Sequence, residues 1–134
     1  PLAISARCYH ARSHGLHKDG CQYVCDIDPD GLDVMTVDKQ PFLTVNGTQT
    51  LSSSCLSLLP ELEDLSASGV NHFRLSPQTV DMVKVATIFR DVLDGADHST
   101  EGEVKLAAMN SGFVTSNGFV HGDEGWRLIK EVQN

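Results

Sequence analysis

Positive charge is scarce in this sequence. It contains 10 Lys and Arg residues against 18 Asp and Glu residues, which gives a formal net charge of -8 at pH 7. Proteins that bind nucleic acid or an anionic membrane surface usually concentrate positive charge on the binding face. We therefore expect no nucleic acid and no anionic membrane surface among the partners of this protein.

Long apolar runs are absent as well. No stretch approaches the roughly 18 consecutive apolar residues of a membrane-spanning helix, so we expect no membrane span. The sequence begins PLAIS at residues 1–5, without an initiator Met and without a basic region followed by an apolar secretory core. This beginning favours a fragment that starts inside a fold.

Common hydrolase motifs are also missing. We find no G-x-S-x-G elbow, no H-E-x-x-H helix and no recognisable Ser-His-Asp arrangement. These motifs supply the nucleophile or the zinc site of many peptidases. The sequence therefore gives no visible support for peptidase activity.

The cysteines are few and unevenly placed. Cys8, Cys21 and Cys25 follow the spacing C-x12-C-x3-C, and Cys55 stands apart from them. Four thiolates usually hold an iron-sulfur cluster, whereas a structural zinc typically uses two short C-x2-4-C pairs, of which this sequence has one. Four cysteines also allow three disulfide pairings in a secreted domain, but no secretory segment is visible. A metal centre near the N-terminal end is the favoured interpretation.

Apolar patterns after Cys25 predict alternating strands and helices. Strands are expected at residues 34–37, 42–45 and 70–75, and Asn46-Gly47 allows a hairpin after the second. One helix is expected to begin near Cys55 and to end at Gly69. A second is expected to begin at Ser76-Pro77 and to end at Gly95. The later expected segments are a loop at 96–103, a helix at 104–110, a loop at 117–122 and a helix at 126–132.

This order of elements favours right-handed βαβ units over a parallel sheet. The predicted fold class is therefore α/β. A complete (β/α)8 barrel typically needs about 250 residues, and this chain has 134. We expect residues 1–134 to be the C-terminal half of a single TIM-barrel-like domain.

Five short blocks of the sequence resemble the collagenase-like peptidase family, peptidase U-thirty-two. The blocks are SARC at 5–8, KDGC at 18–21 with Cys25, FLTVNGTQT at 42–50, RLSPQ at 74–78 and NGFVHG at 117–122. The resemblance covers most of the chain from residue 2 to about residue 122. Within the family, the C-x12-C-x3-C spacing is most similar to a branch that acts in ubiquinone biosynthesis.

The resemblance implies a specific function. Proteins of this branch bind a 4Fe-4S cluster, pair with a related subunit called UbiU, and act in the cytoplasm. They take part in oxygen-independent hydroxylation of the ring of the quinone precursor, with prephenate implicated as the hydroxyl donor. By resemblance, this chain is expected to be an iron-sulfur subunit of such a hydroxylase system.

The resemblance also implies a ligand set. Cys8, Cys21 and Cys25 match three cluster ligands, and the fourth ligand in that branch is a cysteine upstream of this chain. Other branches take a ligand from a position nearer Cys55, which makes Cys55 a rival. Packing alone also accounts for Cys55, because it would begin the apolar face of the predicted helix and a buried thiol behaves as a small hydrophobe.

Other polar side chains near the cysteines have two interpretations each. His10, His14 and His17 could supplement metal ligation, since imidazole suits zinc and iron, or they could be solvated loop residues. An acidic turn contains Asp26, Asp28 and Asp30. It could bind a hard cation, but it lacks the spaced glutamate of a calcium loop, and a solvated turn explains it equally.

Arg74 is the candidate substrate-binding residue. It lies at the end of the predicted strand 70–75, where barrel enzymes build their sites, and a guanidinium suits a dicarboxylate such as prephenate. A structural salt bridge is the alternative. Asn46 and Gln49 end another predicted strand. They could line the same end of the predicted barrel as Arg74, or they could form hydrogen bonds with turn backbone. Two further function classes stay open, a non-catalytic metal-binding or assembly module and a U-thirty-two-type peptidase.

Overall fold

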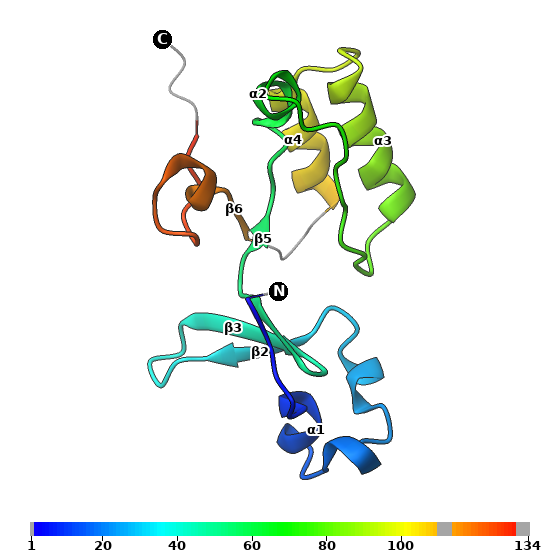
Figure 1. Cartoon of the computed structure of the whole chain (residues 1–134), viewed down its shortest axis with the longest axis vertical. Helices are drawn as coiled ribbons and strands as arrows, with labels where there is room; N and C mark the ends of the chain where they lie inside the picture. The colour runs from blue at the N-terminus through cyan, green and yellow to red at the C-terminus, as the bar shows by residue number, and fades with distance from the viewer. Residues whose placement is uncertain (1, 110–113, 131–134) are drawn as a thin grey trace. The chain divides into compact units, whose positions relative to one another are not determined.

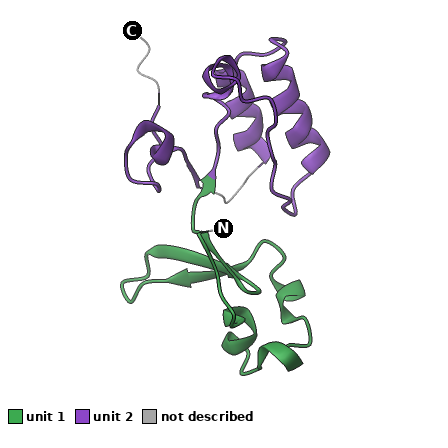
Figure 2. Cartoon of the chain, viewed as in Figure 1, with its two compact units in different colours: residues 1–55 green, residues 56–134 purple. Residues whose placement is uncertain are grey.

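The computed structural model describes residues 2–109 and 114–130. The chain divides into two compact units, residues 1–55 and residues 56–134, which are coloured separately in Figure 2. Helices and strands are both present, so the mixed α and β character predicted from the sequence is confirmed. Within the described ranges, no helix is both long enough and apolar enough to cross a membrane.

Unit 1 is built on a four-stranded sheet with the order β1-β4-β3-β2. The strands are β1 (Ala3–Ile4), β2 (Leu32–Met35), β3 (Pro41–Asn46) and β4 (Gln49–Ser52). All three pairings in this sheet are antiparallel. The parallel βαβ arrangement expected from the sequence is therefore not found among the described residues of unit 1, and the barrel stays a prediction.

The predicted hairpin after residues 42–45 is confirmed. Asn46 of β3 pairs with Gln49 of β4, which leaves a two-residue loop between the strands. Gly47 occupies the first loop position with a φ of 60°. Two-residue hairpin loops need a positive φ there, which glycine adopts without steric cost.

The segment between β1 and β2 contains the three clustered cysteines. It forms α1 (Tyr9–Ser13) and two 3₁₀ turns, η1 (Lys18–Gly20) and η2 (Val24–Ile27). Helix α1 packs against β3 and against η2. Figure 1 shows α1 and the two turns gathered at one end of unit 1.

Unit 2 is mainly helical. Its helices are α2 (Leu62–Ala67), α3 (Met82–Leu93) and α4 (Ser99–Met109), and α3 packs against both of the others. The buried core consists of Leu59, Leu62, Val85, Ile88 and Leu106. Strand β5 (Cys55–Leu56), at the boundary between the units, pairs with β6 (Thr115–Ser116), and η3 (Gly118–His121) follows β6.

Two predicted starting points in unit 2 are wrong. The helix expected near Cys55 begins only at Leu62, because a proline at position 60 disfavours helical backbone in the residue before it. The helix expected at Ser76 begins at Met82, where the Asp81 carboxylate caps it by accepting a hydrogen bond from the Lys84 backbone N–H at 3.1 Å.

Two segments of unit 2 have a different secondary structure from the one predicted. Residues 70–75 form no strand; instead, Phe73 and Leu75 pack against the helical core. Helix α4 begins at Ser99, within the predicted loop 96–103. Gly102 lets α4 pack closely against Leu59. Any Cβ at position 102 would lie 2.8 Å from Leu59 Cδ2, which is closer than side chains can pack.

The predicted helix ends are confirmed. Gly69 and Gly95 follow α2 and α3 with φ angles of 94° and 73°, as C-terminal glycines do. The predicted helix 104–110 forms the second half of α4, with residue 110 outside the described residues. The helix predicted at 126–132 is wrong over residues 126–130, which form no helix, and residues 131–132 lie outside the described part.

Candidate functional site

The three clustered cysteines take distinct positions in the α1 to η2 segment. Cys8 is buried at the N-cap of α1, where its Sγ accepts a hydrogen bond from the Ala11 backbone N–H at 3.3 Å. Cys21 follows η1 directly and Cys25 lies within η2, and both side chains are half-buried. No disulfide joins the four cysteines of the chain.

The loop between Cys21 and Cys25 has an unusual backbone. Cys21 is right-handed helical, with φ -71° and ψ -15°, whereas Gln22 and Tyr23 have φ angles of 53° and 54°. Left-handed backbone costs a non-glycine residue roughly 1–2 kcal/mol. A right-handed residue followed by a left-handed one also points successive N–H groups into one concavity, called a nest, which is found at many phosphate and iron-sulfur sites.

The cysteine sulfurs do not form a mononuclear metal site. Among the described residues, only one group of three or more potential ligand atoms lies within 4.8 Å of one another, and it contains no cysteine. Zinc–sulfur bonds of about 2.3 Å place tetrahedral sulfur ligands about 3.8 Å apart. The geometry therefore disfavours a zinc ion held by three of these thiolates. The cysteines of a 4Fe-4S cluster bind different iron atoms and can lie further apart.

The group that does converge consists of His10, His14 and Asp28. His10 lies in α1 and His14 is the C-cap residue of that helix, one turn later, and their rings stack with centroids 5.7 Å apart and 8° between the ring planes. Asp28 follows η2, and its Oδ2 lies 3.1 Å from His10 Nε2. All three were candidate metal ligands in the sequence, but a common site was not predicted. Its sequence signal is the i, i+4 spacing of the histidines, which has meaning only in a helix, and no helix is predicted at residues 9–13.

His10 is not the solvated residue that one interpretation of the sequence expected. Its side chain is 0% exposed, and neither ring nitrogen makes a hydrogen bond with a described residue. The 3.1 Å contact with Asp28 satisfies the distance for an ion pair but not the angles for a hydrogen bond. An unsatisfied buried polar atom costs about 1–3 kcal/mol, so a group that pairs with Nε2 would make this arrangement less unfavourable.

A second polar cluster lies inside unit 2. Glu61 is 7% exposed, and its Oε1 accepts a hydrogen bond from Asn117 Nδ2 at 2.6 Å and contacts His121 Nε2 at 2.8 Å. An ionised carboxylate only accepts, so a hydrogen bond between these two side chains needs the tautomer of His121 with its proton on Nε2. In that tautomer, Asn117 Nδ2 and His121 Nε2, which lie 3.4 Å apart, are two donors that share Glu61 Oε1 as their acceptor.

Asn117 also connects this cluster to the backbone. Its Oδ1 accepts from the Ile129 N–H at 2.7 Å, and its Nδ2 donates to the Ile129 carbonyl at 2.9 Å. The cluster therefore holds η3 against residues 127–129. Asn117 and His121 belong to the NGFVHG block, but no local signal in the sequence pointed to Glu61, which is 56 residues from Asn117.

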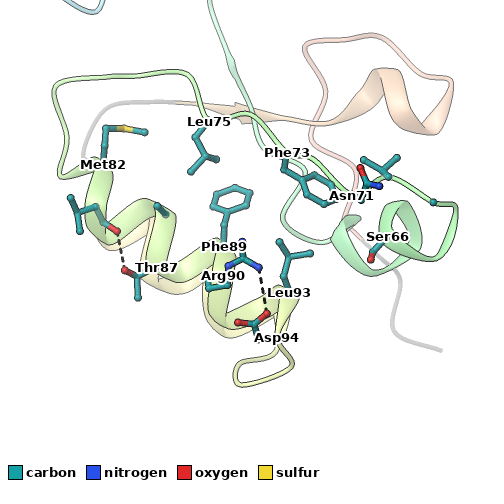
Figure 3. Close-up of a pocket in the computed structure, with 14 residues that line it drawn as sticks. Ser66, Asn71, Phe73, Leu75, Met82, Thr87, Phe89, Arg90, Leu93 and Asp94 are labelled. Atoms are coloured by element: carbon teal, nitrogen blue, oxygen red, sulfur yellow. Dashed lines mark hydrogen bonds and ion pairs between the residues drawn. The ribbon is translucent and has the colours of Figure 1, made fainter.

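Arg74 lies in the unpaired segment between α2 and α3. It is exposed and forms no ion pair with any described residue. Its neighbours Phe73 and Leu75 line a groove beside α3, together with Phe89 and Leu93, as Figure 3 shows, and Arg74 is not among the lining residues. The exposed guanidinium of Arg74 is available to an anion. The alternative interpretation, a structural salt bridge, is not supported, because no described acidic residue pairs with Arg74.

Asn46 and Gln49 lie in the β3–β4 hairpin of unit 1. The side chain of Asn46 donates to the Pro29 carbonyl at 3.1 Å, so it satisfies turn backbone as one interpretation expected. Cys55 lies in β5, half-buried, and not on a helix face.

Comparison with known proteins adds no assignment. No protein-family model matches this chain, and no solved structure matches it either.

Proposed function

We propose that this chain is the C-terminal portion of a UbiV-like member of the collagenase-like peptidase family (peptidase U-thirty-two), within a single barrel domain. In this proposal the protein is the iron-sulfur subunit of an oxygen-independent hydroxylase in ubiquinone biosynthesis. It works in the cytoplasm with a UbiU-like subunit. Its small-molecule substrates are the quinone precursor and prephenate.

The backbone of the loop between Cys21 and Cys25 is the observation that carries the cluster assignment. A cluster with thiolate ligands is anionic, and the nest at Cys21 and Gln22 turns backbone N–H groups toward one concavity suited to an anion. The strained φ angles of Gln22 and Tyr23 are of the kind that persists at functional sites. The residues present therefore fit a cluster bound at this loop.

The other two elements of the segment support the same assignment. Cys8 caps α1, and α1 packs against η2, which contains Cys25. Two of the proposed ligands are thus carried on elements that contact each other. When bound, a 4Fe-4S cluster supplies an electron-transfer centre whose potential depends on burial and on hydrogen bonds to sulfur. Burial of Cys8 favours low solvent access on its side of the site.

The fourth ligand is proposed to be a cysteine upstream of this chain, with Cys55 as the rival. Cys55 is separated from the cysteine-rich segment by the whole β2 to β4 part of the sheet in sequence. We expect Cys55→Ala to retain the cluster and to cost about 1 kcal/mol of stability, as small truncations of partly buried side chains do. Complete loss of iron from Cys55→Ala would instead assign Cys55 to the ligand set.

Anaerobic reconstitution tests the assignment directly. The full-length protein should gain about four iron and four sulfide per chain, as a 4Fe-4S cluster requires, with broad visible absorbance. Cys21→Ala and Cys25→Ala should each lose the absorbance and most of the iron. Full iron and sulfide occupancy in the triple variant of Cys8, Cys21 and Cys25 would refute the cluster at this loop.

A second candidate function is a non-catalytic metal-binding or assembly module. The convergence of His10, His14 and Asp28 favours it, because that group can bind a metal without any cluster. Hydroxylation of the quinone precursor by the full-length subunit together with a UbiU-like partner distinguishes the two functions, since a metal-binding module alone supports no turnover. No observation favours a peptidase.

A further inference from the structure

We propose that His10, His14 and Asp28 form a mononuclear site for a divalent transition ion such as Zn²⁺ or Fe²⁺. This site is separate from the thiolate cluster proposed above and does not depend on it. Its ligands are two imidazoles from one helix turn and one carboxylate from the loop that packs against that helix.

Burial of His10 is the first argument. The ring is completely buried, yet neither nitrogen has a hydrogen-bond partner among the described residues. Buried polar groups in folded proteins are nearly always satisfied, and an unsatisfied one requires an explanation. A metal ion that accepts the Nε2 lone pair supplies a partner for the ring nitrogen that faces Asp28, and the ring proton then lies on Nδ1.

The separation between His10 and Asp28 is the second argument. Nitrogen and oxygen ligands at about 2.0–2.1 Å from a tetrahedral ion lie about 3.3 Å apart. His10 Nε2 and Asp28 Oδ2 are 3.1 Å apart, without the angles of a hydrogen bond. Two ligand atoms that both face a common ion have this distance and this misalignment.

His14 completes the group. One of its ring nitrogens lies within 4.8 Å of the ligand atoms of His10 and Asp28. Because His14 is exposed at the C-terminal end of α1, its side chain can rotate toward the ion. An ion can also reach the site from solvent on the exposed side of His14. The acidic turn with Asp26 beside Asp28 adds negative charge that attracts a cation.

The ligand types decide which ions fit. Imidazole suits zinc, iron, copper and nickel, whereas calcium and magnesium prefer oxygen ligands alone. Two histidines and one carboxylate with open positions are the ligand set of mononuclear Fe²⁺ sites, and three protein ligands with an open position also describe catalytic zinc. The site should therefore bind Zn²⁺ and Co²⁺ much more tightly than Mg²⁺.

The test uses a background in which Cys21 and Cys25 are both alanine, so that thiolates contribute little to metal binding. In this full-length variant, we expect one equivalent of Zn²⁺ to bind in competition with a chromophoric chelator. Bound Co²⁺ should show no sulfur-to-cobalt charge-transfer band. Zn²⁺ should also raise the melting temperature, because a ligand that binds only the folded state stabilises it.

Ligand variants identify the site. His14→Ala and Asp28→Asn should each weaken Zn²⁺ binding by at least about tenfold, since even indirect changes at metal sites cost that much. His14 is exposed, so this variant should fold, as circular dichroism will verify. The matched control is His17→Ala, another exposed histidine of the segment that makes no side-chain cap, and it should change affinity less than twofold.

Three results would overturn the inference: no stoichiometric Zn²⁺ binding in the thiol-depleted background, wild-type affinity in His14→Ala, or an equal loss in His17→Ala. The iron and sulfide content of reconstituted protein with its cysteines intact separates this inference from the proposed function. A cluster without Zn²⁺ binding would refute only the histidine site, and Zn²⁺ binding without a cluster would refute only the proposed cluster.

Discussion

Truncation of Asn117 should destabilise unit 2 strongly. Asn117 is 1% exposed, and its side chain makes one hydrogen bond to the Glu61 carboxylate and two to the Ile129 backbone. Neutral hydrogen bonds contribute about 1 kcal/mol each and bonds to charged groups about 1.5–3 kcal/mol. Water can reach the partly buried backbone of Ile129, and Glu61 Oε1 keeps its contact with His121, so part of the loss is recovered. We therefore expect Asn117→Ala to cost about 3 kcal/mol.

Urea denaturation monitored by tryptophan fluorescence measures this cost. Trp126 is the only tryptophan in the chain and lies in the segment that Asn117 holds in place. The matched control is Asn71→Ala, because Asn71 is exposed and should change stability by less than about 0.5 kcal/mol. A cost below about 1 kcal/mol for Asn117→Ala, or an equal cost for Asn71→Ala, would refute the role given to the buried network.

Three further changes follow from individual contacts. Gly118→Ala should destabilise unit 2 by about 2–3 kcal/mol in the same assay, because a Cβ there would lie 2.0 Å from the backbone oxygen of Glu124; a neutral effect would contradict the described path of the chain. The hydrogen bond to Asp97 raises the pKa of Lys105 above its ordinary value of 10.5. The stabilisation is therefore complete below pH 10.5 and is lost as the pH rises through the raised pKa. Asp97→Asn should weaken that alkaline decline of the melting temperature, because Asp97 is the largest cause of the raised pKa and Glu101 contributes less. Retention of the same decline in Asp97→Asn would assign it to other groups. Arg74→Ala in the full-length protein should lower anaerobic hydroxylation of the quinone precursor and leave the cluster spectrum and stability unchanged, since Arg74 is exposed. Unchanged anaerobic quinone production would exclude Arg74 from the substrate site.

Local signals predicted part of the fold correctly. The hairpin at Asn46-Gly47 and the helix ends at Gly69 and Gly95 depend on backbone angles that glycine adopts more easily than other residues. Such preferences act within a few residues of the chain. They can therefore be read without knowledge of the rest of the molecule.

Elements that depend on distant contacts were predicted poorly. Residues 70–75 have the composition of a strand, but Phe73 and Leu75 pack against the helical core of unit 2 and the segment pairs in no sheet of the described residues. Gly102 looks like a loop residue, yet it lies inside α4 because only a residue without a Cβ allows contact with Leu59 and Val92. Packing overrides intrinsic propensity at both places.

The sequence by itself determined the clustering of Cys8, Cys21 and Cys25, because this clustering is a distance along the chain. Only the tertiary structure decided that the His10 ring is buried without a hydrogen bond to any residue that the structure describes, and that Asp28 faces it. The same holds for Glu61 and Asn117, which are 56 residues apart and meet in the interior of unit 2. Burial and contact between distant residues arise from the packing of whole elements, and a pattern of neighbouring residues does not contain that information.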